Sequence, residues 1–264
     1  MSGILAQGRS SAFFFLVLIW VAVLYFMDQA KKGKGRNLRR LPAIDAIEEA
    51  VGRATEMGKT VTFEMGVGEG GLASSRASAH MAAIDLIGYV SQITARNNVP
   101  LVVSVSWAEL IPMVEAKINE SYLMENQAQP DLGKMVRFYG SDQVTFAMGA
   151  MGTIYAEKPG ANFIMGWVYD IESLVITAAA ADVGAIQVGG SADYYSTGYM
   201  LVNTDYALMP EEVICAGAYV SNDAVIIGGI AGQDIAKIIL IGISLLGSIL
   251  ALLGSNIIYD LTKL

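Results

Sequence analysis

The sequence has one cysteine and one histidine among 264 residues. A single cysteine, Cys215, excludes an intrachain disulfide and any metal site built from several cysteines, and we expect it to be a small buried side chain. A single histidine, His80, excludes the usual histidine-rich zinc sites and leaves one residue for Ser-His-Asp chemistry. Because His80 falls near the start of a predicted helix, we expect a surface or packed histidine rather than a catalytic one.

Charge is also scarce, since only 16% of the residues are charged, against about 25% in an ordinary soluble domain. Two stretches, 10–27 and 238–259, carry no charged residue. Each can cross a hydrocarbon core of about 30 Å as a helix, so we predict two transmembrane helices that flank a central domain. A removed signal peptide is the competing interpretation of the first stretch, but the run is long, lacks an A-x-A-like cleavage site and precedes a basic cluster.

A basic linker follows the first stretch, whereas only Arg9 precedes it. The linker cations are Lys31, Lys32, Lys34, Arg36, Arg39 and Arg40. The positive-inside tendency places this flank in the cytoplasm, which predicts a two-span protein of the cell membrane, with its main domain cytoplasmic and both termini outside. Lys237 would then lie at the cytoplasmic start of the second span. The linker also suits anionic lipid headgroups, although a plain solvated flank uses the same residues.

The body of the chain is acidic and poor in cations. Residues 41–234 contain eight Lys or Arg and twenty-three Asp or Glu, and no Lys or Arg occurs from 159 to 236. Nucleic-acid binding depends on neutralising phosphates, so we predict no nucleic-acid partner.

Apolar strands alternate with helical patterns through this body. The predicted strands are 60–65, 101–107, 135–140, 161–169 and 185–190, and the helices are 41–59, 75–97, 108–126, 141–158 and 171–184. A further strand is predicted within 199–209, and Pro210 precedes two acids as at a helix start. This alternation predicts an α/β fold with an open, doubly wound, mainly parallel sheet that is Rossmann-like. The predicted boundaries are 1–30 and 223–264 for the membrane regions, 31–41 for the linker and 42–222 for the domain.

The stretch EMGVGEGGLASSRASAH follows the first predicted strand and opens a helix. Its Gly66, Gly68 and Gly71 match G-x-G-x-x-G, the pattern of a dinucleotide-binding turn. Amides there could hold an anion together with Ser74, Ser75 and Arg76. Three features oppose this interpretation, namely the charge of Glu69 inside the turn, the helix that precedes the strand, and the lack of an acid about twenty residues on at a second strand end. A phosphate cradle and a structural turn or subunit contact both remain open.

Acidic and hydroxylic residues dominate the other predicted strand ends. They are Glu109, Ser141, Asp142, Asp170, Glu172, Ser191 and Asp193, with the aromatic Trp107 and Tyr194 beside them. Oxygen ligands such as Asp142 and Asp170 suit a divalent cation. No spacing fixes a ligand set, so a solvated acidic surface is the alternative, and we predict no catalytic residue and no cofactor beyond such a cation.

The second apolar stretch carries small residues four apart, at Ser244 and Ser248 and at Gly247 and Ala251. Such pairs let helices approach closely, which favours association with the first span or with another subunit.

The junction KGRNLRRLPAIDAIEEAVGRATEMGK resembles the opening of a family of uncharacterised bacterial and archaeal membrane-anchored proteins, most strongly over residues 36–58. The resemblance implies a prokaryotic, membrane-attached α/β domain and supplies no activity. Our hypothesis is a self-assembling homo-oligomeric scaffold at the membrane. The alternatives are a domain that binds a small ligand, nucleotide or divalent cation, with or without catalysis, and an accessory subunit of a larger membrane complex.

Overall fold

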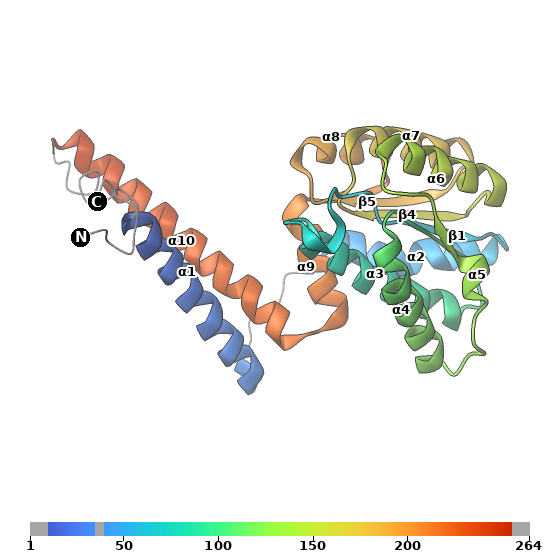
Figure 1. The fold of residues 1–264 in the computed structure, drawn as a ribbon, viewed down its shortest axis with the longest axis horizontal. Coiled ribbons are helices and arrows are strands. Elements are labelled where there is room, and N and C mark those ends of the chain that lie inside the picture. The colour runs from blue at the N-terminus through green and yellow to red at the C-terminus, as the bar shows by residue number, and fades with distance from the viewer. Residues whose placement is uncertain (1–9, 35–39, 255–264) are drawn as a thin grey trace. The chain divides into compact units, whose positions relative to one another are not determined.

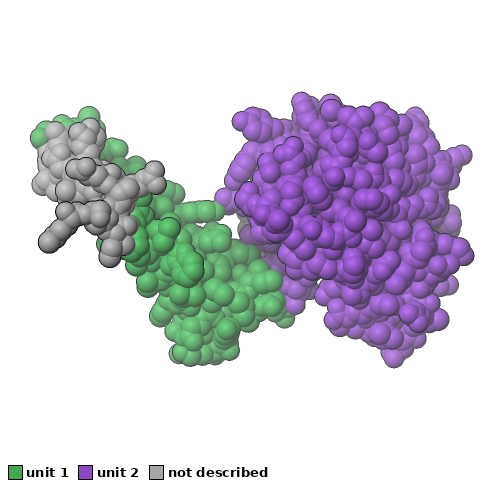
Figure 2. Space-filling model, in the orientation of Figure 1, with its two compact units in different colours: residues 1–38, 222–264 green, residues 39–221 purple. Residues whose placement is uncertain are grey.

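The computed structural model describes residues 10–34 and 40–254 (Figure 1). The chain divides into one unit of residues 1–38 and 222–264 and a second unit of residues 39–221 (Figure 2).

The second unit is built on a six-stranded sheet in which every neighbouring pair is parallel. The strands are β1 Val61–Glu64, β2 Leu101–Val105, β3 Val136–Phe138, β4 Ala161–Gly166, β5 Ile186–Ser191 and β6 Tyr206–Leu208. Their order is β3-β2-β1-β4-β5-β6, which is the doubly wound order, and it confirms the predicted fold. The chain reverses its direction of growth between β1 and β4, where such folds bind ligands.

Helices cover both faces of this sheet (Figure 1). The first layer contains α2 Pro42–Glu56, α3 Ala77–Arg96, α4 Ile111–Met124 and α9 Pro210–Ser221, and the second contains α6 Gln143–Glu157, α7 Asp170–Asp182 and α8 Tyr194–Asn203. The short elements η2 Gly71–Ala73, η3 Ala108–Leu110 and α5 Leu132–Met135 complete the connections. Each layer has its own buried cluster against the sheet.

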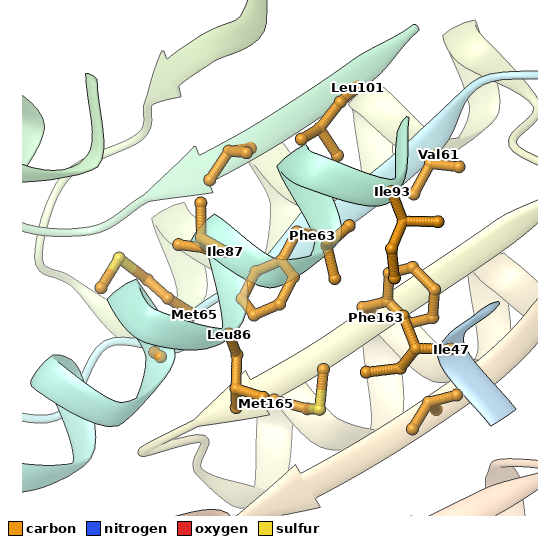
Figure 3. Packing of buried hydrophobic residues seen from close by; sticks show 14 of the residues in the cluster. Ile47, Val61, Phe63, Met65, Leu86, Ile87, Ile93, Leu101, Phe163 and Met165 are labelled. Atoms are coloured by element: carbon orange, nitrogen blue, oxygen red, sulfur yellow. The ribbon is translucent and has the colours of Figure 1, made fainter. Parts of the chain in front are cut away.

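The larger core cluster centres on two phenylalanines of neighbouring strands. Phe63 of β1 and Phe163 of β4 are partners in register, and both are fully buried. Leu86 and Ile87 of α3 and Ile47 of α2 pack over them (Figure 3). Burial of one such side chain stabilises the fold by about 1.5–3 kcal/mol, so this cluster fixes α2 and α3 against β1 and β4.

The strand predicted within 199–209 is present but short. Within 199–209 the structure forms the last turns of α8 up to Asn203, and only Tyr206–Leu208 is a strand. The helix begins earlier because the side chain of Asp193 caps it by accepting a hydrogen bond from the Ser196 amide at 3.3 Å. The buried Met200 then anchors the helix to the core, which outweighs the β-branched character of the run.

The first unit is a pair of long apolar helices, α1 Ser10–Gln29 and α10 Ala224–Leu252. Both are long and apolar enough to cross a membrane by length and composition. They are antiparallel, since Gly228 lies against Met27 and Gly232 lies against Val23. The π-helical turn η1 Ala30–Lys34 follows α1.

The second apolar helix begins before the uncharged stretch 238–259. The helix begins at Ala224, because Asp223 caps it by accepting hydrogen bonds from the amides of Val225 and Ile226 at 2.7 and 3.3 Å. Lys237, predicted at the start of a span, therefore lies near the middle of α10. The part of the predicted span after residue 254 lies outside the described residues.

Small residues four apart lie at two places along α10. Gly228 and Gly232 approach the α1 backbone closely, as small residues at this spacing allow. Ser244, Ser248 and Ala251 are exposed and Gly247 is half-buried, and the Ser248 hydroxyl donates to the Ser244 carbonyl at 2.9 Å within the helix. Association through these four predicted residues stays a prediction.

Candidate functional site

The glycine-rich loop after β1 lies against the end of β4 and against the start of the β2 connection. Gly66, Gly68 and Gly71 have φ of 75°, 43° and 51°, a region that favours glycine. A Cβ at Gly66 would lie 2.3 Å from the Trp167 carbonyl oxygen, and one at Gly71 would lie 2.1 Å from the Glu109 Oε1 atom. The glycine spacing thus meets the needs of a turn packed on both sides.

The amides of this loop, which an anion would use, are donors to other parts of the chain. The Val67 amide donates to Glu172 Oε2 at 3.0 Å. The Leu72 amide donates to Glu109 Oε1 at 2.7 Å. The Gly68 amide donates to the Trp167 carbonyl at 3.1 Å. Two of the chain's own carboxyl groups therefore lie where a phosphate would accept hydrogen bonds in a dinucleotide-binding turn.

The carbonyls of the loop are also bonded. Ser106 Oγ donates to the Gly66 carbonyl at 2.7 Å, and Trp107 Nε1 donates to the Val67 carbonyl at 2.6 Å. His80 is fully buried, and its Nε2 lies 3.0 Å from the Gly68 carbonyl oxygen. Burial lowers the pKa of His80, against weaker opposing effects of that carbonyl and of the Glu109 charge. A neutral His80 can donate its Nε2 proton to Gly68, so the histidine holds the loop in place.

The cation beside the loop is also engaged. The Arg76 guanidinium lies 5.1 Å from the centre of the Trp167 ring and 3.8 Å from Glu69 Oε2. Ser74 Oγ donates to the Gly71 carbonyl at 2.9 Å and accepts from the Arg76 amide at 3.1 Å, while Ser75 is exposed. Glu69, which the sequence places inside the turn, thus faces Arg76 at its rim.

Among the acids at this edge of the sheet that have a hydrogen-bond partner, Glu172 has the pKa that differs most from its ordinary value. Its side chain is fully buried in the first turn of α7. Burial raises the pKa of Glu172 to about 8, while the hydrogen bond from the Val67 amide acts in the opposite direction. At neutral pH the carboxyl is therefore largely protonated, which suits its place beneath the loop.

The predicted acids Asp142 and Asp170 lie at the starts of α6 and α7. Asp142 caps α6 by accepting from the Thr145 amide at 2.9 Å, and Asp170 accepts from Gln143 Nε2 at 2.9 Å. These hydrogen bonds lower the pKa of both acids. Within residues 10–34 and 40–254, no group of three or more His, Cys, Asp or Glu could hold a metal ion.

Sequence reasoning missed a polar layer beneath α6–α8. Glu64 of β1 is fully buried, and neither carboxyl oxygen has a partner among the described residues. Its register partner on β2 is Ser104. Two residues earlier on β1, Thr62 Oγ1 donates a hydrogen bond to Asn162 Oδ1 at 2.7 Å. Burial raises the pKa of Glu64 well above its usual range. The sequence contains a sign of this polar layer. A strand that is covered on both faces should be apolar throughout, yet polar and apolar residues alternate along β1.

The basic linker is described only in part. Lys31, Lys32 and Lys34 are exposed in η1, and Lys32 pairs with Asp28 at 2.5 Å. Arg40 is exposed and pairs with Asp45 at 2.6 Å. Arg36 and Arg39 lie outside the described residues. The structure thus brings three of the predicted cations together on one turn.

The comparisons with known proteins return one result. A family model described as Domain of unknown function (DUF6754) matches residues 2–262. No curated protein and no solved structure matches the chain. The resemblance over residues 36–58 therefore extends along nearly the whole chain, and it adds no activity and no site residue.

Proposed function

Because the chain belongs to this family of unknown function, we propose from its structure that it is a membrane-anchored, self-assembling structural protein of a prokaryotic cell membrane. The observation that carries the proposal is the exposure of α1 and α10. In the most apolar window of α1 no residue is buried, and in that of α10 6% of the residues are buried. A core helix of a soluble protein would be mostly covered, so this hairpin suits lipid on its outer surface.

The proposed topology follows from the turn after α1. Lys31, Lys32 and Lys34 gather at one end of the hairpin, and such a cluster favours the cytoplasmic side. The α/β unit is then cytoplasmic, the outer ends of both helices lie on the far side, and the exposed lysines are placed to meet anionic headgroups.

A charged side chain on α10 supports association within the membrane. Gly232 lies against Val23, and the helices are antiparallel. Asp234, which is exposed, is therefore level with the middle of the apolar run of α1. Charged residues at such depth usually face protein or a polar cavity rather than lipid, which favours a neighbouring subunit.

The glycine-rich loop supports a structural role for the domain. An anionic ligand would have to displace Glu109 from the Leu72 amide and Glu172 from the Val67 amide. The second candidate function, ligand binding by this domain, requires the ligand to replace these carboxyl groups. If the domain binds a nucleotide or a divalent ion, that ligand should raise the melting temperature, and Gly68→Val should abolish the rise.

Two measurements test the proposal on the full chain. In a Cys215→Ser background, the exposed Lys158→Cys should react with a membrane-impermeant maleimide only after intact cells are permeabilised. In lipid nanodiscs, mass photometry should give a protein mass that corresponds to two or more 28.1 kDa chains. Release of the protein from membranes by alkaline carbonate would refute the membrane anchor. A monomer at every protein concentration would refute the self-assembly. Assembly only with other co-purified proteins would favour an accessory subunit.

A further inference from the structure

The second helical layer of the α/β unit presents an apolar outer surface, which we call the α6–α8 face. It is represented by Met148 and Tyr155 of α6, Leu174 of α7, and Tyr195, Leu201 and Val202 of α8. Tyr195 is 89% exposed and Val202 is 82% exposed, and the α6 and α7 side chains of the set are each more than 40% exposed. A helix that faces water normally turns polar side chains outward, and these three helices do not.

The centre of this face carries no charge. No charged residue occurs from 143 to 156, which covers α6 up to its last residue, and α8 has none. The acids of α7 lie at its two ends, and Glu172 among them is buried. The opposite layer differs, since α2 and α4 carry both acids and cations. The lack of charge is therefore specific to one side of the domain.

The face is continuous and large enough for a stable interface. α6 contacts α7, and α7 contacts α8 (Figure 1). These helices have 15, 13 and 10 residues, so the layer is about 20 Å long and, with neighbouring axes about 10 Å apart, about 30 Å wide. Its projected area of about 600 Å² approaches the ~800 Å² that each partner contributes to a standard interface.

We propose that the α6–α8 face binds the α6–α8 face of a second copy of this chain. The inference rests on the proposed self-assembly and names the surface that performs it. A charge-free face offers no ion pair to a charged partner, whereas the same face on another copy covers both apolar surfaces in one contact. Helices that lie on lipid carry Lys or Arg beside their apolar side, and this face has none within an acidic domain. Its tyrosines are typical of contacts between proteins.

The pairing places α7 at its centre. α7 lies between α6 and α8 in the layer, and in a two-fold contact the middle of the shared patch lies near the symmetry axis. Leu174, exposed on α7, is then close to Leu174 of the second copy.

The test uses charge and cross-linking on the full chain in nanodiscs. Leu174→Glu and Val202→Glu should each weaken association at least about tenfold, because a carboxylate would be buried against an apolar surface. The matched control is Leu123→Glu on α4, 70% exposed and outside the face, and it should leave the oligomer unchanged. In a Cys215→Ser background, Leu174→Cys should give a dimer with a short bismaleimide, and Leu123→Cys should not.

The outcomes separate this inference from the proposed function. If the unmodified chain assembles and both face variants assemble equally well, with no cross-link at Leu174→Cys, the inference is overturned and self-assembly stands. If the face variants keep their oligomeric state but bind vesicles of neutral lipid less well, the face is a lipid contact and the inference is wrong. The cross-link gives a result even if a buried charge destabilises the fold.

Discussion

The carboxyl of Glu172 accepts a hydrogen bond from the Val67 amide at 3.0 Å and is fully buried. This hydrogen bond connects the first turn of α7 to the glycine-rich loop after β1, at the point where the strand order reverses between β1 and β4. The chain thus satisfies with its own acid an amide that related folds offer to a ligand.

Glu172 should make stability depend on pH. Its folded pKa of about 8 exceeds the ordinary value of 4.5, so the folded state retains a proton that the unfolded state loses. Stability is then complete below about pH 4.5 and falls as pH rises toward 8, by up to about 1.4 kcal/mol per pH unit. Glu172→Gln should flatten much of this decline in melting temperature, because a neutral amide still accepts from Val67.

The control for this prediction is Asp142 at the start of α6. The Thr145 hydrogen bonds lower the pKa of Asp142, so its contribution is present at neutral pH and is lost only as pH falls through the acid range. Asp142→Asn should leave the slope between pH 5 and 8 unchanged. A slope that survives Glu172→Gln in full would mean that Glu172 does not hold the proton.

Glu64 should be replaceable by an apolar residue. Its carboxyl is fully buried without a hydrogen-bond partner among the described residues, which costs about 1–3 kcal/mol. Glu64→Met should therefore raise the free energy of unfolding at pH 7, by an amount that shrinks toward pH 4, and urea titrations would measure it. A large loss of stability at both pH values would show that the carboxyl has a role in the fold that these contacts do not account for.

Gly68 should be intolerant of a side chain. Its φ is 43°, and a Cβ would lie 2.7 Å from His80 Nε2, so Gly68→Ala should cost about 1–3 kcal/mol. Gly52 lies inside α2 with open space around its Cβ position, and Gly52→Ala should stabilise by up to about 1 kcal/mol. Thermal unfolding compares the two. Equal melting temperatures would remove the steric explanation of the loop.

The alternation of strands and helices was sufficient to predict the sheet. Buried parallel strands such as β2 and β4 are short apolar runs between capped helices, and this local pattern does not depend on distant contacts. The strand within 199–209 is shorter than its segment because the apolar run around Met200 suits either state, and the Asp193 cap and burial in the second cluster favour the helix there. The uncharged stretch 238–259 begins later than α10, because Asp234 and Lys237 interrupt the apolar residues of that helix.

The location of the candidate site could be predicted from the sequence, but the side chains that bind its loop could not. The G-x-G-x-x-G spacing located the loop at the strand end, which parallel topology alone requires. The acids that bind its amides, Glu109 and Glu172, come from 37 and 105 residues further along the chain, and no local pattern reveals such pairs. The polarity of Glu64 was visible, but its isolation depends on what β2, β4 and the second helical layer place around it.

Gly232 should fix the contact between the two apolar helices. A Cβ there would lie 2.5 Å from Val23 Cα, whereas one at Gly229 would meet nothing within 4 Å. Gly232→Val should therefore separate the helices and lower the melting temperature in mild detergent, at a cost of about 1–3 kcal/mol, and Gly229→Val should not. Since the clash is with backbone, adding Val23→Ala cannot relieve it. Recovery of the melting temperature in the double variant would instead assign the contact to side chains and disprove close backbone packing at this position.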